Sequence, residues 1–173
     1  MASMKEIQVE KVTLNIGTGK PGPELEKALK LLEQITGVKP VETKTQKRIP
    51  SWSLRPGLSI GAKVTLRGEK AVEVLKRLLD AVEYYIPSKK FDNEGNFSFG
   101  IKEYIDIPGM KYNMDIGIMG LEVAVTLKRP GFRIKRRMIK TKKIPRRHRI
   151  SKEEAIKFMQ ENFNVKTEQE GEE

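Results

Sequence analysis

Hydrophobic and polar residues alternate along three stretches in the first half of the chain. Val12, Leu14 and Ile16 follow a period of two, which is typical of a strand with one buried and one solvated face. The same alternation over residues 60–67 predicts another strand, and a shorter strand is expected at 39–44. The connection between those two strands is rich in proline and glycine, so we do not expect it to form regular structure.

Helical spacing of hydrophobic residues occurs twice. Between residues 25 and 35, leucine, alanine and isoleucine recur at helical spacing, with Pro23 near the first turn and Gly37 at a C-terminal cap position. A second amphipathic pattern lies within residues 68–85, and Pro87 prevents its continuation. Both stretches are predicted to be helices that bury one face.

The second half of the chain adds two strand patterns and one short helix. Residues 97–107 and residues 121–127 each keep a single strand phase. Ser151 and Glu154 have the spacing of a capping box, which predicts a helix through residues 151–163.

Together these elements predict an α+β fold, an antiparallel β-sheet with helices packed on one face, plus a basic C-terminal extension. Each strand pattern leaves one polar face, and no internal repeat is present. The expected organisation is a single α+β domain at 1–127, a basic extension at 128–150, a C-terminal helix at 151–163 and an acidic, disordered tail at 164–173.

Composition excludes several kinds of site. The 173 residues, 38% of them hydrophobic, suffice for one core, and the absence of cysteine excludes disulfides, thiolate nucleophiles and zinc ribbons. No apolar run approaches the roughly 20 residues that cross a bilayer, and no signal peptide is evident at the start. We therefore expect a soluble cytosolic protein with no membrane partner.

Positive charge is concentrated in one segment. The chain has a net charge of +11, and residues 128–149 contain twelve lysines and arginines without any acidic residue. Such a density of cations binds a polyphosphate by displacing its counterions, which makes RNA or DNA the leading partner. The alternative is an ordinary solvated basic surface.

The polar faces of two predicted strands carry further donors. If the first and third strands bury their hydrophobic residues, the opposite face presents six residues without an acid among them, namely Lys11, Thr13, Asn15, Lys63, Thr65 and Arg67. Lysine and arginine can meet phosphates, while threonine and asparagine can bond to ribose hydroxyls. An ordinary solvated sheet face would show the same alternation.

The connection at residues 45–59 is long enough to suggest a task of its own. It contains Arg48, Arg55 and the only tryptophan of the chain, Trp52. The indole ring could stack on a base or ribose, or it could pack inward against the body of the protein.

Two signals could suggest an enzyme. Gly17, Gly19 and Gly22 form a G-x-G-x-x-G pattern, but Pro21 and Pro23 remove amides that would hold a pyrophosphate, so no nucleotide cofactor is expected. The single histidine, His148, has no metal-ligating or triad partners and is expected to contact phosphate. No catalytic residue, metal or cofactor is therefore predicted.

Five ordered blocks resemble the large-subunit ribosomal protein five family, the 5S-rRNA-binding protein of the central protuberance. They are VEKVTLNIGTG (9–19), ITGVKPVETK (35–44), RPGLSIGAKVTLRG (55–68), FDNEGNFSFGIKEYI (91–105) and IMGLEVAVTL (118–127). Bacterial members have a longer N-terminal helix, a glutamine at the position of Val38 and no basic extension, so the chain resembles the archaeal branch.

The resemblance implies a structural protein of the cytoplasmic large ribosomal subunit, not an enzyme. Asn15 and Thr65 match positions at which family members contact 5S rRNA. Val38 matches a further RNA-contacting position, where valine lacks the side-chain amide of the bacterial glutamine. The loop at 49–59 corresponds to one that reaches the P-site tRNA. Further implied partners are large-subunit rRNA, other 5S-associated ribosomal proteins and, across an intersubunit bridge, a protein of the small-subunit head.

Sequence and resemblance together give two sets of expected contact residues. Those expected to bind rRNA are Lys11, Thr13, Asn15, Lys39, Lys44, Lys63, Thr65, Arg67, Arg133, Arg136, Arg137, Arg146 and Arg147. Those expected on the tRNA-facing loop are Arg48, Ser51, Trp52 and Arg55. Two alternative functions are a DNA-binding architectural protein and a nucleotide-dependent enzyme built on the glycine loop.

Overall fold

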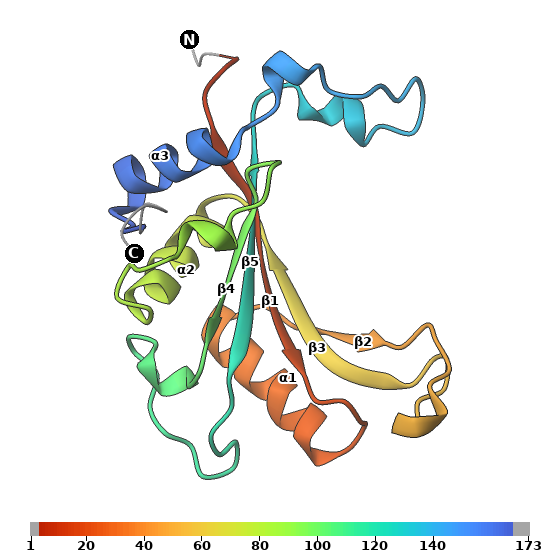
Figure 1. Cartoon of the computed structure of the whole chain (residues 1–173). Coiled ribbons are helices and arrows are strands. Elements are labelled where there is room, and N and C mark those ends of the chain that lie inside the picture. Colours follow the sequence, from red (N-terminus) through yellow and green to blue (C-terminus); the bar gives the residue numbers. More distant parts are fainter. Residues whose placement is uncertain (1–3, 168–173) are drawn as a thin grey trace.

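A computed structural model describes residues 4–167 and contains a five-stranded antiparallel sheet with three helices, which confirms the predicted α+β fold (Figure 1). The strand order is β2-β3-β1-β5-β4. The strands are β1 (Gln8–Gly17), β2 (Val41–Lys44), β3 (Ser59–Leu66), β4 (Phe97–Ile101) and β5 (Leu121–Lys128). The helices are α1 (Pro23–Thr36), α2 (Glu69–Asp80) and α3 (Lys152–Phe163).

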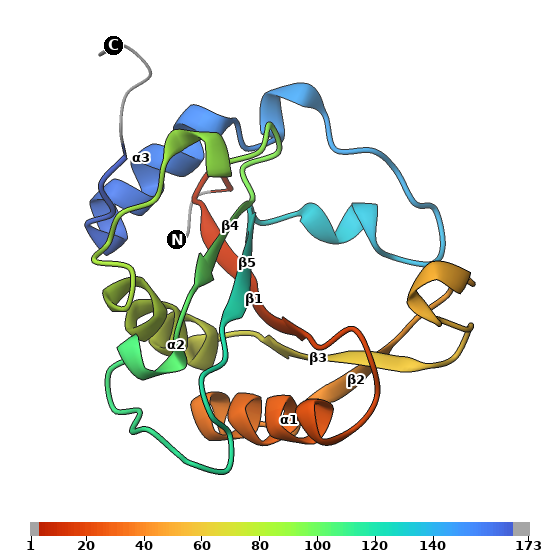
Figure 2. The ribbon, with the colours of Figure 1, turned by 60° about the horizontal axis from the view of Figure 1, so that its bottom comes forward.

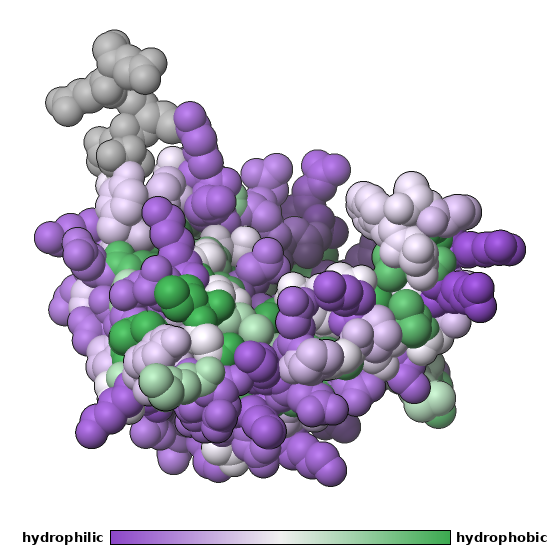
Figure 3. Space-filling view, turned by 90° about the horizontal axis from the view of Figure 1, so that it is seen from below, coloured by the Kyte–Doolittle hydropathy of each residue, from purple (hydrophilic) through white to green (hydrophobic). Residues whose placement is uncertain are grey.

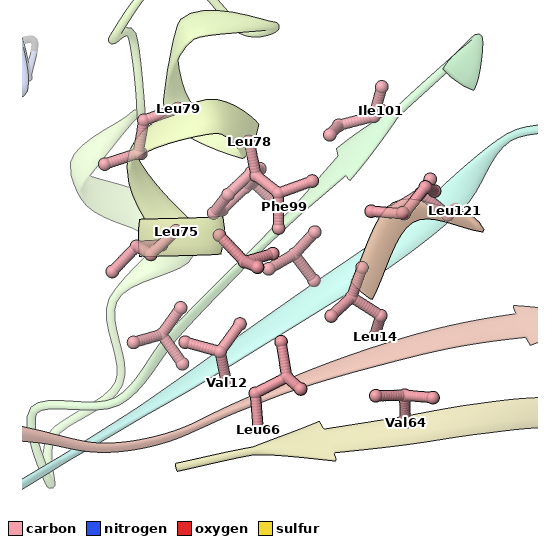
Figure 4. Packing of buried hydrophobic residues seen from close by; sticks show 14 of the residues in the cluster. Val12, Leu14, Val64, Leu66, Leu75, Leu78, Leu79, Phe99, Ile101 and Leu121 are labelled. Atoms are coloured by element: carbon pink, nitrogen blue, oxygen red, sulfur yellow. The ribbon is translucent and has the colours of Figure 1, made fainter. Parts of the chain in front are cut away.

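One hydrophobic core lies between the sheet and the helices. Val12 and Leu14 of β1 are fully buried, as are Leu75 and Leu78 of α2. Figure 4 shows the strand residues pointing from the sheet toward those of α2. Because side chains alternate along a strand, burying this set turns the intervening residues of β1, β3 and β5 to the other side of the sheet.

Two predicted elements end several residues earlier in the structure than in the sequence pattern. The strand phase predicted for 97–107 is wrong beyond Ile101, because Tyr104–Asp106 forms a 3₁₀ turn that places the Tyr104 ring in the core. Helix α2 ends at Asp80 instead of near Tyr85, since Glu83 and Tyr84 adopt positive φ. The carbonyl of Tyr84 then accepts from the amide of Lys166, so tertiary pairing replaces the last helical turn.

Helix α3 begins with the predicted capping box. The Ser151 hydroxyl accepts from the amide of Glu154, and the Glu154 carboxylate accepts from the amide of Ser151 at 3.0 Å. The same carboxylate accepts from the guanidinium of Arg129 at 2.8 Å. The hydrogen bond from the Ser151 amide is the main reason why the pKa of Glu154 lies below its ordinary value of 4.5; burial opposes this shift and Arg129 adds to it.

We expect the Glu154→Gln substitution to lower the free energy of unfolding by about 1 kcal/mol near neutral pH, the usual contribution of a helix cap. A carboxyl with a lowered folded pKa stabilises the fold above its unfolded pKa, and that contribution disappears as the pH falls through the folded pKa. The difference between wild type and variant should therefore shrink below about pH 4.5. Urea unfolding at neutral and acidic pH measures it, with the exposed Glu153→Gln as control; an equal difference at both pH values would contradict the assignment.

The first residues of the predicted acidic tail pack against the body. Asn164 caps α3 in the left-handed conformation, Val165 is buried, and the carbonyl of Lys166 accepts from the amide of Ile86. The rest of the predicted tail, 168–173, lies outside the described residues. Within the described range no helix is long and apolar enough to cross a membrane.

Candidate nucleic-acid interface

The sheet face opposite the helices, called the open face below, presents polar residues in rows across the strands. Antiparallel pairing sets Thr13 opposite Thr65 and Asn15 opposite Lys63. Side chains directly opposite each other in such pairs have Cβ atoms about 5 Å apart, and successive rows are about 7 Å apart. These four residues therefore form a compact quartet, and Lys11 lies beyond it on β1.

Within residues 4–167 the quartet has no partner of its own. In the part of the chain that the structure describes, the side chains of Thr13, Asn15, Lys63 and Thr65 make no hydrogen bond or ion pair, although Thr13 and Asn15 are only half exposed. Polar groups with restricted access to water are usually hydrogen-bonded. An unused set of neighbouring donors and acceptors on a rigid sheet is suited to binding an external polar ligand.

Two acids on or beside the open face were missed by the sequence analysis. Glu122 of β5 lies directly opposite Asn15, on the side away from Lys63. Glu10 lies in a β-bulge of β1 and has a side chain only 9% exposed, with its carboxylate paired to Arg67 at 3.3 Å and to Arg136. The six predicted residues contain no acid, but their surroundings do.

These acids change what the face can bind. A carboxylate beside Asn15 repels phosphate there and can accept from a base amino group or a ribose hydroxyl. Among the described residues Lys11 and Lys63 make no ion pair, and Lys63 lies on the side of Asn15 away from Glu122. The side of the quartet next to Glu122 is therefore suited to bases and riboses, and the side next to Lys63 to phosphates.

The basic extension folds back on itself in two arms. The outgoing arm contains the 3₁₀ turn Phe132–Lys135, and the returning arm contains the 3₁₀ turn Arg146–His148. The amide of Lys142 donates to the carbonyl of Ile134 at 3.2 Å, which joins the arms, and Ile150 anchors the base in the core. A folded segment presents its charges in a fixed arrangement.

Most cations of the extension face solvent. The predicted rRNA contacts in this segment are all exposed, namely Arg133, Arg136, Arg137, Arg146 and Arg147. Arg129 is different, because it is 6% exposed and its guanidinium donates to the carbonyl of Arg149 at 3.2 Å as well as to Glu154. Arg129 therefore holds the extension and α3 together and is not available to a ligand.

The loop that connects the antiparallel strands β2 and β3 is exposed and held rigid by internal hydrogen bonds. Ile49 and Leu54 exchange backbone hydrogen bonds across the 3₁₀ turn Pro50–Trp52, and Leu54 is buried. The ring of Trp52 is 70% exposed, which decides against inward packing. Arg48, Ser51 and Arg55 are also exposed.

The remaining predicted residues lie at the edge of the sheet or inside the extension. Lys39 precedes the edge strand β2 and Lys44 is its last residue; both side chains are exposed. Val38 is half-buried against the core, so the side chain there points inward. His148 packs edge-on against Phe132, and its Nε2 lies 2.9 Å from the carbonyl oxygen of Pro130.

Both the basic extension and the β2–β3 loop project on the side of the sheet away from the helices. In Figure 1 the extension lies at the upper right of the sheet and the loop at the lower right. Figure 2 also places both on the side opposite α2 and α3. The open face is thus bordered by two basic projections. Across the described residues no group of acids and histidines could hold a metal ion.

Comparison with known proteins finds one family along almost the whole chain. The sequence model described as "Ribosomal protein L5" matches residues 3–55, and the model for the C-terminus of the same ribosomal family matches residues 59–166. "Large ribosomal subunit protein uL5" of Nanoarchaeum equitans is 55% identical over 94% of this chain and 96% of its own length. The proteins of the same name from Sulfolobus acidocaldarius and Methanobrevibacter smithii are 52% and 49% identical, covering 94% and 95% of this chain and 91% and 97% of their own lengths.

Proposed function

The chain belongs to the ribosomal protein L5 family, and from that premise we propose that its open face binds 5S rRNA and helps attach it in the central protuberance. Membership makes the protein a structural, non-enzymatic constituent of the cytoplasmic large ribosomal subunit. The expected family and its archaeal character are thereby confirmed. The two alternative functions, a DNA-binding architectural protein and a nucleotide-dependent enzyme, do not fit this family.

The observation that carries the proposal is the unpartnered quartet of Thr13, Asn15, Lys63 and Thr65. Hydroxyl and amide groups without internal partners can bond to ribose 2′-hydroxyls and to the edges of unpaired bases, which is how proteins distinguish RNA from DNA. Asn15 and Thr65 lie diagonally across the β1–β3 pair, so one RNA strand can contact both.

The exposed arginines of the basic extension are proposed to bind rRNA phosphates. Arg133, Arg137, Arg146 and Arg147 make no ion pair within the described residues, so their charges remain available. Guanidinium groups bind phosphate in a bidentate manner, which fixes the register of a protein on its nucleic acid. Large-subunit rRNA and 5S rRNA are both sources of phosphate for the proposed site.

The β2–β3 loop is proposed to contact the P-site tRNA. An exposed tryptophan beside Arg48 and Arg55 offers a flat ring for stacking and two charges for the backbone. The internal hydrogen bonds of the loop hold Trp52 away from the body, and little conformational entropy is lost when such a loop binds.

A contact with another protein is proposed at the connection between β4 and β5, at the end of the sheet away from the basic extension. Tyr112, Met114 and Ile118 are exposed in the connection between β4 and β5, and Figure 3 shows hydrophobic side chains gathered on this end among hydrophilic ones. Exposed apolar groups of this kind favour protein partners. The intersubunit bridge to the small-subunit head and contacts with other 5S-associated ribosomal proteins are the proposed uses.

Site-specific crosslinking in assembled large subunits tests the proposal. A photoreactive amino acid at Ala124, which is exposed on the open face, should crosslink to 5S rRNA, and one at Trp52 should crosslink to P-site tRNA. The control position is Lys76, exposed on α2 on the opposite side of the sheet. Crosslinks to 5S rRNA from position 76 with none from position 124 would contradict the assignment of the open face.

A further inference from the structure

A cavity of about 520 Å³ lies between the two arms of the basic extension. It is lined by the outgoing arm at Phe132, by the returning arm at residues 141–144, and by Arg149 and Ile150 at the base. Its volume falls within the range of pockets that hold small ligands. Neither the open face nor the proposed tRNA contact uses this cavity.

The lining combines an apolar floor with a cationic rim. Phe132, Ile144 and Ile150 supply hydrocarbon surface, and Lys142 and Lys143 supply positive charge. A nucleotide has the complementary composition, a flat apolar base joined to an anionic phosphate. A duplex backbone, by contrast, presents only phosphate and sugar and would leave the apolar floor unused.

From this complementarity we propose that the cavity binds one unpaired nucleotide of the rRNA, with its base against Phe132 and its phosphate at the lysine rim. The inference rests on the proposed binding of rRNA by the extension and adds a specific ligand to it. Unpaired bases that stack on aromatic side chains are a common means of RNA recognition.

The cavity is formed before any ligand binds. The ring of Phe132 contacts the His148 ring edge-to-face, with centroids 5.8 Å apart, and His148 is itself held against the carbonyl of Pro130. The hydrogen bond from Lys142 to Ile134 fixes the separation of the two arms. A ring held in place loses little freedom on stacking, which favours binding.

The turn before β4 closes one side of the cavity. Gly95 is buried at that turn with a positive φ, and a Cβ atom there would lie 2.6 Å from Ile150, so only glycine permits the close approach. This contact brings Glu94 to the cavity wall, where its carboxylate is 3.4 Å from Lys135. The cavity is therefore bounded by the body of the protein as well as by the extension.

The test compares three short RNA hairpins of one sequence, with a perfect stem, with one bulged adenosine and with an abasic residue at the bulge. Binding of the full chain is measured by fluorescence anisotropy at salt near 0.3 M, where non-specific attraction is weak. The bulged adenosine should increase affinity about tenfold over the other two hairpins, as expected for stacking one base on an aromatic ring.

Phe132→Leu keeps the apolar volume but removes the ring, so it should reduce the preference for the bulge to less than about twofold without changing affinity for the perfect stem. Phe132→Tyr should retain the preference. The matched control is Met138→Leu at the tip of the extension, where the side chain is 99% exposed and does not line the cavity.

Four outcomes would overturn the proposal. If the wild type binds all three hairpins with equal affinity, the proposed nucleotide site is wrong, but the proposed binding of rRNA by the extension still stands. If Phe132→Leu still prefers the bulged hairpin, Phe132 does not contribute to the nucleotide site. Displacement of the bulged hairpin by micromolar adenosine monophosphate would identify a mononucleotide site instead of an RNA site. Failure of every hairpin to bind would count against rRNA binding by the extension as well.

Discussion

Replacing Arg133, Arg137, Arg146 and Arg147 together by alanine is expected to weaken binding to rRNA by about 1,000-fold at 0.1 M salt. The four side chains are exposed and lie on both arms of the basic extension. Each phosphate contact releases close to one counterion, so each is worth somewhat less than a factor of ten at this salt concentration relative to 1 M. Four such contacts multiply to the expected loss.

The same variant should change the salt dependence of binding. The slope of log K against log salt is expected to fall by about three to four, since it measures the number of phosphates neutralised. Binding to 5S rRNA and to an unrelated RNA should weaken alike, because phosphate contacts carry no sequence information. Anisotropy titrations over a salt series give both the affinity and the slope.

A charge-matched control separates local contacts from net charge. Replacing Lys27, Lys30, Lys70 and Lys76 by alanine removes the same four charges from α1 and α2, on the other side of the sheet. Affinity should change by less than about threefold in this variant, because charges beyond a Debye length are screened. Equal losses in both variants would show that net charge alone drives binding, against the assignment of the extension.

The double substitution Asn15→Ala with Thr65→Ala is expected to weaken binding to 5S rRNA about 30-fold while leaving the salt slope unchanged. Both side chains are uncharged, so no counterion release is lost. Each makes no hydrogen bond within the described part of the chain, so the substitutions leave no internal partner unsatisfied. The loss is the combined value of several hydrogen bonds to RNA, each worth about 1 kcal/mol.

The fold should survive this double substitution, since both residues lie on the solvent side of the β1–β3 pair and outside the core. A thermal melt with an unchanged midpoint checks this. The control is Gln34→Ala with Asn162→Ala, which removes two neutral polar side chains from α1 and α3 and should leave binding intact. A reduced salt slope in the double variant would assign the effect to displaced cations instead of lost hydrogen bonds.

Strong local periodicity was enough to predict most of the elements of the fold. The alternation around Val12 and Leu14 and the helical spacing before Gly37 each correspond to one element, and the spacing of Ser151 and Glu154 predicted the start of α3. The strand order could not be predicted, because it depends on pairing between residues far apart in the chain. Tertiary contacts of Tyr104 and Tyr84 ended two elements earlier than their patterns indicated.

The polar and basic residues of the candidate site could be predicted from the sequence, but its acidic residues could not. Strand phase alone puts Asn15 and Thr65 on the polar side, and charge counting alone finds the extension. That Glu122 faces Asn15 depends on the β1–β5 register, and that Glu10 reaches Arg67 depends on a β-bulge. Neither the register nor the bulge leaves a local signal in the sequence, and the cavity in the extension likewise requires two arms to meet.

The most direct test of the central claim is the ratio of the dissociation constants of the wild-type protein for its own 5S rRNA and for a size-matched, unrelated structured RNA, measured across a salt series. Specific contacts persist as phosphate attraction is screened, so the ratio should favour 5S rRNA at least about tenfold near 0.5 M salt. Asn15→Ala with Thr65→Ala should bring the ratio close to one. Equal affinity of the wild type for both RNAs at every salt concentration would contradict recognition of 5S rRNA by the open face.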